Sequence, residues 1–379
     1  MYKDPYPISK SLFLTSFNNG AWWAADDSYG IWLLDDCGRH EKVYSAEGIF
    51  CFAPMPLLPR KVPPAIPSSL HEYLAKENLA LVYVSDIYKG LDGVENGAVK
   101  YIRIMEQPSR SIAQRHEGDE QRLSNNAVSL SLSLTPKYCH GIIDVNDDAT
   151  ASFYVPANKN IYFQLLDENY MLIQTERTYI NYMPGEIRSC IGCHENSSEA
   201  PRTPVNRPKA LSMRPKKARP MPGETSPKRI YDYQKDIQPI LDAKCVSCHG
   251  GDKPAANLDL RNEETTLFNK SYESLRKYIV WPLENAETNS GEYSNPYVFG
   301  SHPSRIVNKL IKGCAGVRPD LSFEEFVRFV SWLDTGRNTT HLGTARKIYA
   351  TRGSPTIVPS TLGKAPPRNL RISSSSDLL

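Results

Sequence analysis

The chain has 379 residues, enough for two or three domains that each bury a hydrophobic core. Its 45 basic and 42 acidic side chains nearly balance, so the formal net charge at pH 7 is only +3. No apolar run approaches the ~18 residues that a helix needs to cross a bilayer, which excludes a transmembrane segment.

Residues 1–66 have the pattern of short β-strands. Leu12–Phe17 and Ile31–Leu34 are apolar runs that end in Asn/Gly and Asp/Gly turns. Two isolated hairpins would be only marginally stable, so we expect these strands to close a larger β-region. The prolines from Pro54 to Pro67 then predict an extended connector.

Residues 67–199 predict a β-sandwich that ends in a cysteine motif. Val128–Leu134 alternates apolar and polar residues without a break, as a half-buried strand does. The other predicted strands are Ala80–Tyr88, Ala98–Met105, Ala151–Val155, Ile161–Leu166 and Met171–Thr175.

Residues 200–229 are basic and rich in proline. Between Pro201 and Arg229 stand nine basic residues, one acidic residue and seven prolines. This composition predicts a stiff, extended, solvated linker that buries no core. No aromatic residue stands between the basic ones to stack on bases, so we do not expect nucleic-acid binding.

Residues 230–345 predict a small all-α domain, followed by a tail over 346–379. Ser304 can cap a helix that ends at Gly313. Ser322 and Glu325 form a capping box before a helix with an apolar stripe, which Gly336 ends. A helix, a cysteine motif, a long loop and an aromatic carboxy-terminal helix follow one another as in a small cytochrome c. We expect Trp332 to pack in the core of this domain.

Two copies of C-x-x-C-H carry the strongest functional signal. The pattern is the attachment signature of c-type haem: two thiols form thioethers to the haem vinyls, and the histidine ligates the iron. We therefore expect two covalent haems, with His194 and His249 as iron ligands. The motif residues are Cys190, Cys193 and His194 in the first copy, and Cys245, Cys248 and His249 in the second.

A structural zinc site is the alternative. Two C-x-x-C pairs that share one zinc ion usually lie roughly 15–20 residues apart. Here 51 residues separate Cys193 from Cys245, and an all-cysteine site has no use for a histidine after each pair. Four cysteines lie outside the motifs and allow three disulfide pairings, among which the sequence does not choose: Cys37, Cys51, Cys139 and Cys314.

The sixth iron ligand decides whether a haem only transfers electrons or also binds small molecules. All seven methionines precede the second motif, and only His302 and His341 follow it. His302 stands directly before a capped helix, so we predict it to be the sixth ligand of the second haem. For the first haem the candidates stay open, and so does an unfilled position; they are His116, His140, Met171, Met183, Met213 and Met221.

Several stretches of the sequence resemble parts of hydrazine synthase alpha subunits. Pro184–Glu195 and Asp147–Ala157 are similar to the middle domain of that family. Asp236–Gly250, Gly300–Arg305 and Leu321–Asp334 are similar to the cytochrome domain that follows it. Residues 1–66, with Ile31–Asp35 and Lys42–Tyr44, resemble the closing blade of the β-propeller that comes first in the family.

One position departs from the family. In its hydrazine-forming enzyme the first haem has a tyrosine ligand four residues after the motif histidine, and that histidine turns to a zinc ion. Ser198 occupies this position here, and no tyrosine lies between His194 and Tyr231. We therefore expect a non-hydrazine-forming relative, with ordinary ligation of iron by His194.

The expected function is electron transfer by a diheme c-type module, with a redox partner or other subunits as partners, and an oligomer is compatible with the sequence. The alternative is a multihaem oxidoreductase that acts on a small nitrogen or oxygen species at the first haem; a scaffold role is a third class. Haem attachment takes place outside the bacterial cytoplasm, so we expect a periplasmic or otherwise exported protein. Since no signal peptide precedes these residues, we expect a mature form or a carboxy-terminal piece of a longer protein.

Two covalent haems per chain are the first testable prediction. Expression with a periplasmic signal and the haem-attachment machinery should give two haems by pyridine haemochrome, both retained after acid–acetone extraction, because thioethers survive that treatment. Colourless protein with stoichiometric zinc would contradict the prediction.

Overall fold

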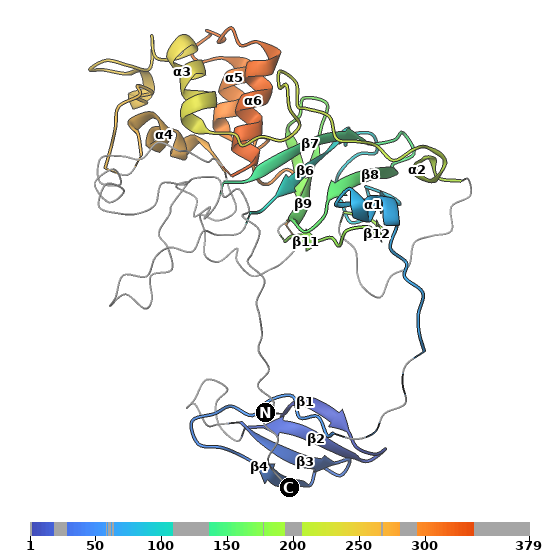
Figure 1. Cartoon of the computed structure of the whole chain (residues 1–379). Coiled ribbons are helices and arrows are strands. Elements are labelled where there is room, and N and C mark those ends of the chain that lie inside the picture. The colour runs from blue at the N-terminus through green and yellow to red at the C-terminus, as the bar shows by residue number, and fades with distance from the viewer. Residues whose placement is uncertain are drawn as a thin grey trace, which may run out of the picture. The chain divides into compact units, whose positions relative to one another are not determined.

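The computed structural model describes residues 2–18, 29–57, 59, 62, 64–108, 136–176, 178–193, 207–266, 268–280 and 294–336. The chain divides into two compact units, Met1–Ser68 and Ser69–Leu379, which are taken one at a time below (Figure 1). Within the described residues, no helix is both long and apolar enough to cross a membrane.

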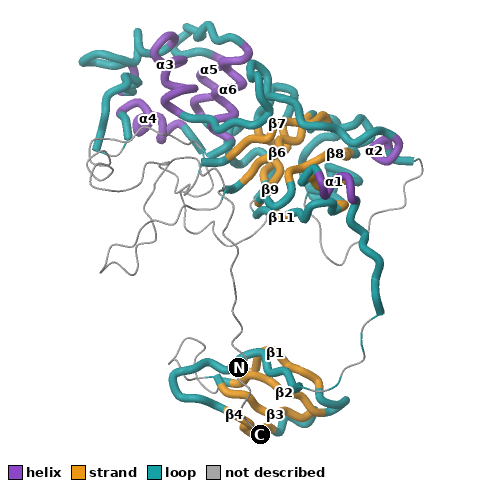
Figure 2. Tube along the Cα trace, in the orientation of Figure 1, coloured by secondary structure: helices purple, strands orange, loops and turns teal. Residues whose placement is uncertain are grey.

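The first unit is a four-stranded antiparallel sheet in the order β1-β2-β3-β4 (Figure 2). The two predicted strands are present as β2 and β3. Each pairs on its outer side with a strand that the sequence pattern did not predict: β1 pairs with β2, and β4 pairs with β3. The larger propeller expected around this sheet stays a prediction. The strands are β1 (Tyr2–Pro7), β2 (Leu12–Phe17), β3 (Gly30–Asp35) and β4 (His40–Tyr44).

The second unit contains two further sheets. In the larger sheet the order is β10-β9-β6-β7, with β11 also paired to β9, and in the smaller it is β12-β5-β8. Apolar residues of both sheets fill one core, which includes Val82, Ile104 and Phe163. The strands are β5 (Leu79–Val84), β6 (Tyr101–Glu106), β7 (Tyr138–Asp144), β8 (Ala151–Pro156), β9 (Asn160–Leu166), β10 (Leu172–Thr175), β11 (Ile180–Asn181) and β12 (Ile187–Cys190).

Five of the six strands predicted in this region are present, and the sixth, Val128–Leu134, lies outside the described residues. Strand β7 was not predicted, because His140 and Gly141 interrupt its apolar pattern. Gly141 has a φ of +95°, and a Cβ there would clash with the Arg219 carbonyl. Only glycine fits at this point, so the strand depends on a residue type that normally weakens strands.

Helices α3, α4, α5 and α6 gather at one end of the second unit, next to the β6–β7 sheet, whereas α1 and α2 lie beside the smaller sheet (Figure 1). As predicted, Ser322 and Glu325 form a capping box at the start of α6, and α5 lies between Ser304 and Gly313. The predicted cap by the Ser304 side chain is not formed, because its hydroxyl donates a hydrogen bond to the Gly300 carbonyl at 2.6 Å. Trp332 is fully buried against Tyr233 and Phe329, so its core role is confirmed. The α-helices are α1 (Glu72–Lys76), α2 (Lys209–Ser212), α3 (Gln238–Lys244), α4 (Lys270–Leu275), α5 (Arg305–Lys312) and α6 (Phe323–Asp334); a π-helical turn (Tyr233–Ile237) precedes α3, and 3₁₀ turns cover Ala255–Asn257 and Arg276–Tyr278.

The basic segment is extended but not a free linker, so the expectation of a solvated stretch was wrong for its described part, residues 207–229. Lys216 forms a bridge with Phe153 of β8, and Arg219 forms one with Ile142 of β7. Its backbone therefore satisfies sheet edges that would otherwise be exposed. Met221 is buried, because the segment runs over apolar surface that composition alone does not reveal.

Local carboxylates neutralise part of its positive charge. Lys209 pairs with Asp147, Arg219 pairs with Asp144 at 2.9 Å, and Arg229 pairs with Glu224 and with Asp236.

A buried polar network joins the larger sheet to the carboxy-terminal helix. The Arg103 guanidinium on β6 lies 3.5 Å from the Asp334 carboxylate on α6, and neither side chain is exposed. Arg103 also donates hydrogen bonds to Gln164 (2.9 Å) and Ser331 (3.2 Å). Asp334 accepts hydrogen bonds from the backbone N–H and the hydroxyl of Ser301. Strands and helices therefore share one core rather than forming two free domains.

Replacement of Arg103 tests this link. Arg103→Met should lower the free energy of unfolding by about 3–5 kcal/mol at pH 7, because it leaves the buried Asp334 carboxylate without its cation. Burial raises the pKa of Asp334 to about 6, against the opposing effect of Arg103. The carboxyl group can therefore take up a proton at pH 5, and the loss should be smaller there.

Urea unfolding followed by far-UV circular dichroism at both pH values measures this difference. The matched control is Arg219→Met, which breaks an ion pair that is about half exposed. It should change the stability by less than about 1 kcal/mol. Equal losses in the two variants would contradict the structural role of the buried pair.

Candidate functional site

The first cysteine pair lies at the edge of the smaller sheet. Strand β12 runs parallel to β5 and places Cys190 opposite Val84. The chain beyond β5 then holds the motif, because Ser85 donates its backbone N–H and its hydroxyl to the Cys190 carbonyl, and Cys193 donates its N–H to the Lys89 carbonyl at 3.1 Å. Gly192 lies so close to Lys89 that a Cβ would clash with its carbonyl.

Both thiols of this pair pack against the core between the two sheets. Burial, and then the charges of Glu176 and Cys190, raise the pKa of Cys193, so its thiol is protonated at neutral pH. Tyr182 belongs to the same core and is fully buried, and its hydroxyl has no hydrogen-bond partner. Sequence reasoning missed this residue, because nothing in the pattern around it differs from an ordinary core tyrosine.

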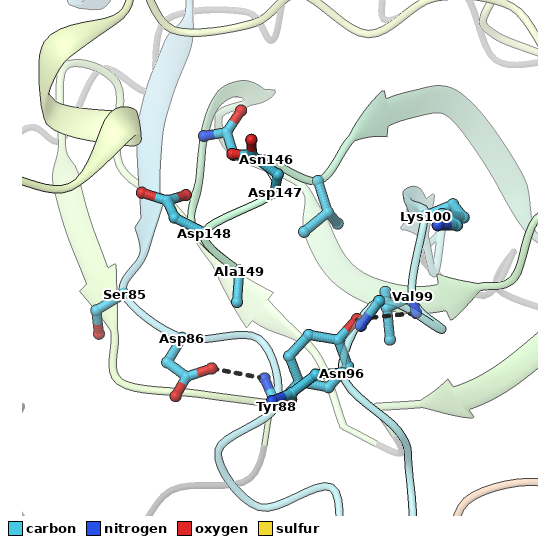
Figure 3. Close-up of a pocket in the computed structure, with 12 residues that line it drawn as sticks. Ser85, Asp86, Tyr88, Asn96, Val99, Lys100, Asn146, Asp147, Asp148 and Ala149 are labelled. Atoms are coloured by element: carbon cyan, nitrogen blue, oxygen red, sulfur yellow. Dashed lines mark hydrogen bonds between the residues drawn. The ribbon is translucent and has the colours of Figure 1, made fainter.

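A polar hollow of about 620 Å³ lies beside the first pair (Figure 3). Ser85 and Asp86 line it, and their backbone N–H groups bond to Cys190 and Ile191. Tyr88 faces it with a hydroxyl that accepts hydrogen bonds from the backbone N–H groups of residues 97 and 99. No motif cysteine lines the hollow, so it is a neighbour of the thiol pair and not its ligand site.

The second cysteine pair follows helix α3 directly. The N–H of Cys245 bonds to the Leu241 carbonyl at 2.8 Å, and the N–H of His249 bonds to the Cys245 carbonyl at 2.9 Å, so the motif continues the helical turn. The His249 side chain is half-buried, and its Nδ1 lies 3.0 Å from the Ala255 carbonyl oxygen. A carbonyl can only accept, so Nδ1 carries the proton and Nε2 keeps its lone pair for a metal.

Cys245 packs against the core shared by the helices and the larger sheet, whereas Cys248 is exposed. Burial, and then the nearby thiols of Cys314 and Cys248, raise the pKa of Cys245 to about 11. Cys314 therefore lies near the second motif, although more than 60 residues follow the motif before it. None of the eight cysteines, all of which lie in the described residues, forms a disulfide.

The two pairs do not converge on a common zinc site. Cys190 and Cys193 pack against the core between the sheets, and Cys245 packs against the core that includes the helices. Among the described residues, the only group of three metal-binding side chains close enough to share an ion is Asp35, Asp36 and Cys37, in an exposed turn of the first unit. A four-thiolate site made of both pairs is therefore not formed.

His302, the predicted sixth ligand of the second haem, lies in a loop that is docked on the larger sheet. Its Nε2 is 3.1 Å from the Asp167 carboxylate, and its ring meets the Tyr297 ring edge-on at 4.8 Å. Gly300 must be glycine, because a Cβ there would clash with the Asp334 carboxylate. Iron ligation by His302 is not tested by these contacts and stays a prediction.

The candidates for the first haem differ in their surroundings. His140 pairs with Glu106 at 2.7 Å, which holds its ring within the larger sheet. Met171 and Met221 are buried in the core shared with the helices, and Met183 and Met213 are exposed. None of these four methionines packs in the core that contains Cys190 and Cys193. His116, His194 and His341 lie outside the described residues.

The residues of the second motif fit a c-type haem. They offer two thiols three residues apart and an imidazole whose Nε2 is free to bind iron. At the first motif, two thiols and an unpartnered buried hydroxyl converge in one core, which fits a bound group that supplies the missing contacts.

Fold and site thus define a β-rich multidomain protein with two candidate haem-attachment sites. Residues 97–195 match the family model of the hydrazine synthase alpha subunit middle domain. Hydrazine synthase subunit alpha of Kuenenia stuttgartiensis is 23% identical over 393 residues, an alignment that covers 78% of this chain and 46% of that protein. A solved structure of Kuenenia stuttgartiensis hydrazine synthase has a TM-score of 0.60 at 18% identity and covers 90% of this chain and 56% of that one.

These matches support a hydrazine synthase alpha-like family for this chain and confirm the predicted resemblance. The chain spans about half the length of the relatives that it matches. The structural likeness, at 18% identity, shows the fold alone.

The predicted ligand role of His302 can be tested by spectroscopy. His302→Ala should turn one haem from low-spin to high-spin and make it able to bind CO, because it opens the sixth position. Asp167→Asn is the matched control, since it breaks the same ion pair but leaves the imidazole in place. His341→Ala should also leave the spectrum unchanged. An unchanged spectrum in His302→Ala would show that another group is the ligand.

Proposed function

We propose that this chain is part of a two-haem c-type oxidoreductase related to hydrazine synthase alpha, which acts on a small nitrogen or oxygen species at the first haem. The second haem is its entry or exit point for electrons. One observation carries the proposal: the match to the middle-domain family runs over residues 97–195 and so includes the whole first motif.

A diheme electron carrier is the second candidate and was the main expectation from the motifs alone. The observation that favours it is the hydrogen bond between His249 Nδ1 and the Ala255 carbonyl, which prepares Nε2 as an iron ligand. The two candidates agree on the second haem and differ on whether the first haem has an open position.

In the proposed enzyme the four motif cysteines anchor the haems through thioethers, and His194 and His249 ligate the two irons. A bound haem supplies an iron that exchanges electrons and, where one axial position is open, binds a small ligand. The described part of the chain contributes orientation: the β5–β12 pairing fixes Cys190, and the end of α3 fixes Cys245. The two attachment points pack against different cores, and strands of the larger sheet contribute residues to both.

Hydrazine formation itself is not part of the proposal. The serine at position 198 lacks the phenol of the family's tyrosine ligand. An exported location and association with a redox partner or further subunits are proposed with the function, because c-type haems are attached outside the cytoplasm and because the relative is named as a subunit.

Titration of the reduced protein with CO separates the two candidates. One haem of the wild type should bind CO, because only the first haem is expected to have an open face. His302→Ala should add a second CO-binding haem, and joint replacement of Cys190 and Cys193 by alanine should remove the first. If neither wild-type haem binds CO or NO, the oxidoreductase proposal fails and the electron carrier stands.

A further inference from the structure

Tyr182 has a side chain whose burial the fold alone does not explain. It stands between β11 and β12, no part of it is exposed, and its hydroxyl has no hydrogen-bond partner. A buried hydroxyl without a partner costs free energy, and such groups are rare in folded proteins. The Tyr182 hydroxyl is therefore available to bond to a group absent from the protein chain.

The neighbours of Tyr182 indicate where that group lies. Cys190 and Cys193 pack against the same core, and the Cys190 thiol is close enough to act on Tyr182 electrostatically. The Arg188 guanidinium covers the phenol ring at 5.2 Å, and Glu186 holds Arg188 through a hydrogen bond of 2.7 Å. One side of the ring is thus covered by Arg188, and the Tyr182 side chain belongs to the core against which both motif cysteines pack.

The protonation of Tyr182 sets the kind of contact that it can make. Burial, and then the charges of Cys190 and Glu176, raise the pKa of Tyr182 above its ordinary value. The hydroxyl therefore keeps its proton at neutral pH and acts as a hydrogen-bond donor.

We propose that Tyr182 belongs to the first haem site and donates a hydrogen bond from its neutral hydroxyl to the small ligand bound at the open iron face. This role rests on the proposed function, since it needs a haem on Cys190 and Cys193. A group bonded to the Cys190 sulfur lies next to the core against which Cys190 packs, and Tyr182 belongs to that core. A donor at this place stabilises a bound anion more than a neutral molecule.

Tyr231 provides a matched control. It too is fully buried with an unpartnered hydroxyl, and an arginine guanidinium, that of Arg229, covers its ring at 4.5 Å. Tyr231 packs in the other core, and the thiol that acts on it is Cys139, which is no motif cysteine. Phenylalanine at either position removes one oxygen atom and leaves the ring in place.

The test measures cyanide binding to the ferric, haem-loaded protein. Tyr182→Phe should weaken the cyanide affinity about tenfold, the effect of one hydrogen bond to an anion, whereas Tyr231→Phe should leave it unchanged. The mass of the proteolytic peptide that carries Cys190 and Cys193 shows in each variant whether haem is attached. Thermal unfolding of the holoproteins checks that neither replacement perturbs the fold.

Three other outcomes would each reject a specific part of the proposal. Equal cyanide affinities with haem attached would reject the role of Tyr182 and leave the proposed function standing. A phenolate-to-iron charge-transfer band that Tyr182→Phe abolishes would make Tyr182 an iron ligand and reject the neutral donor. A wild-type peptide without haem would reject the proposed function and the role of Tyr182 together.

Discussion

The buried contact between Arg103 and Asp334 is the constraint on which the second unit depends. It connects the middle of the larger sheet to the last turn of α6, and Ser301 extends it to the loop of His302. Either charge buried without its partner would destabilise the folded state, so each side chain requires the other beside it. Because of this pair, helices that resemble a free cytochrome domain in sequence share a core with a β-structure.

The two cysteine motifs are positioned by different kinds of secondary structure. At the first, a parallel strand pair and Gly192 bring the chain against the backbone of Lys89, so the thiols are held by sheet geometry. At the second, Cys245 and His249 continue a helical turn, and the Ala255 carbonyl orients the imidazole. A site built into a sheet core suits a haem whose open face is shielded, and a motif at a helix end with an exposed cysteine, Cys248, suits electron exchange with a partner.

The similarity to hydrazine synthase alpha and the one sequence position that departs from it bear on different parts of the proposed function. The matches to hydrazine synthase alpha support the family and the β-rich fold. Ser198 stands where the hydrazine-forming enzyme has its tyrosine, and Tyr182, which precedes the motif in the chain, belongs to the core against which Cys190 and Cys193 pack. The Tyr182 phenol differs in chemistry from that tyrosine ligand. Burial keeps the proton on Tyr182, which favours donation of a hydrogen bond over ligation of iron.

The sequence by itself determined what depends on neighbours within a few residues. These features are the haem motifs, the capping box at Ser322, the helix between Ser304 and Gly313, and the alternating strands such as β5. Tertiary structure decided what depends on partners far along the chain. It packed the basic segment on β7 and β8, and it brought Cys314 to Cys245. Periodicity and caps are local properties of the backbone, whereas these contacts arise only when the two cores bury surfaces that no short stretch of sequence contains.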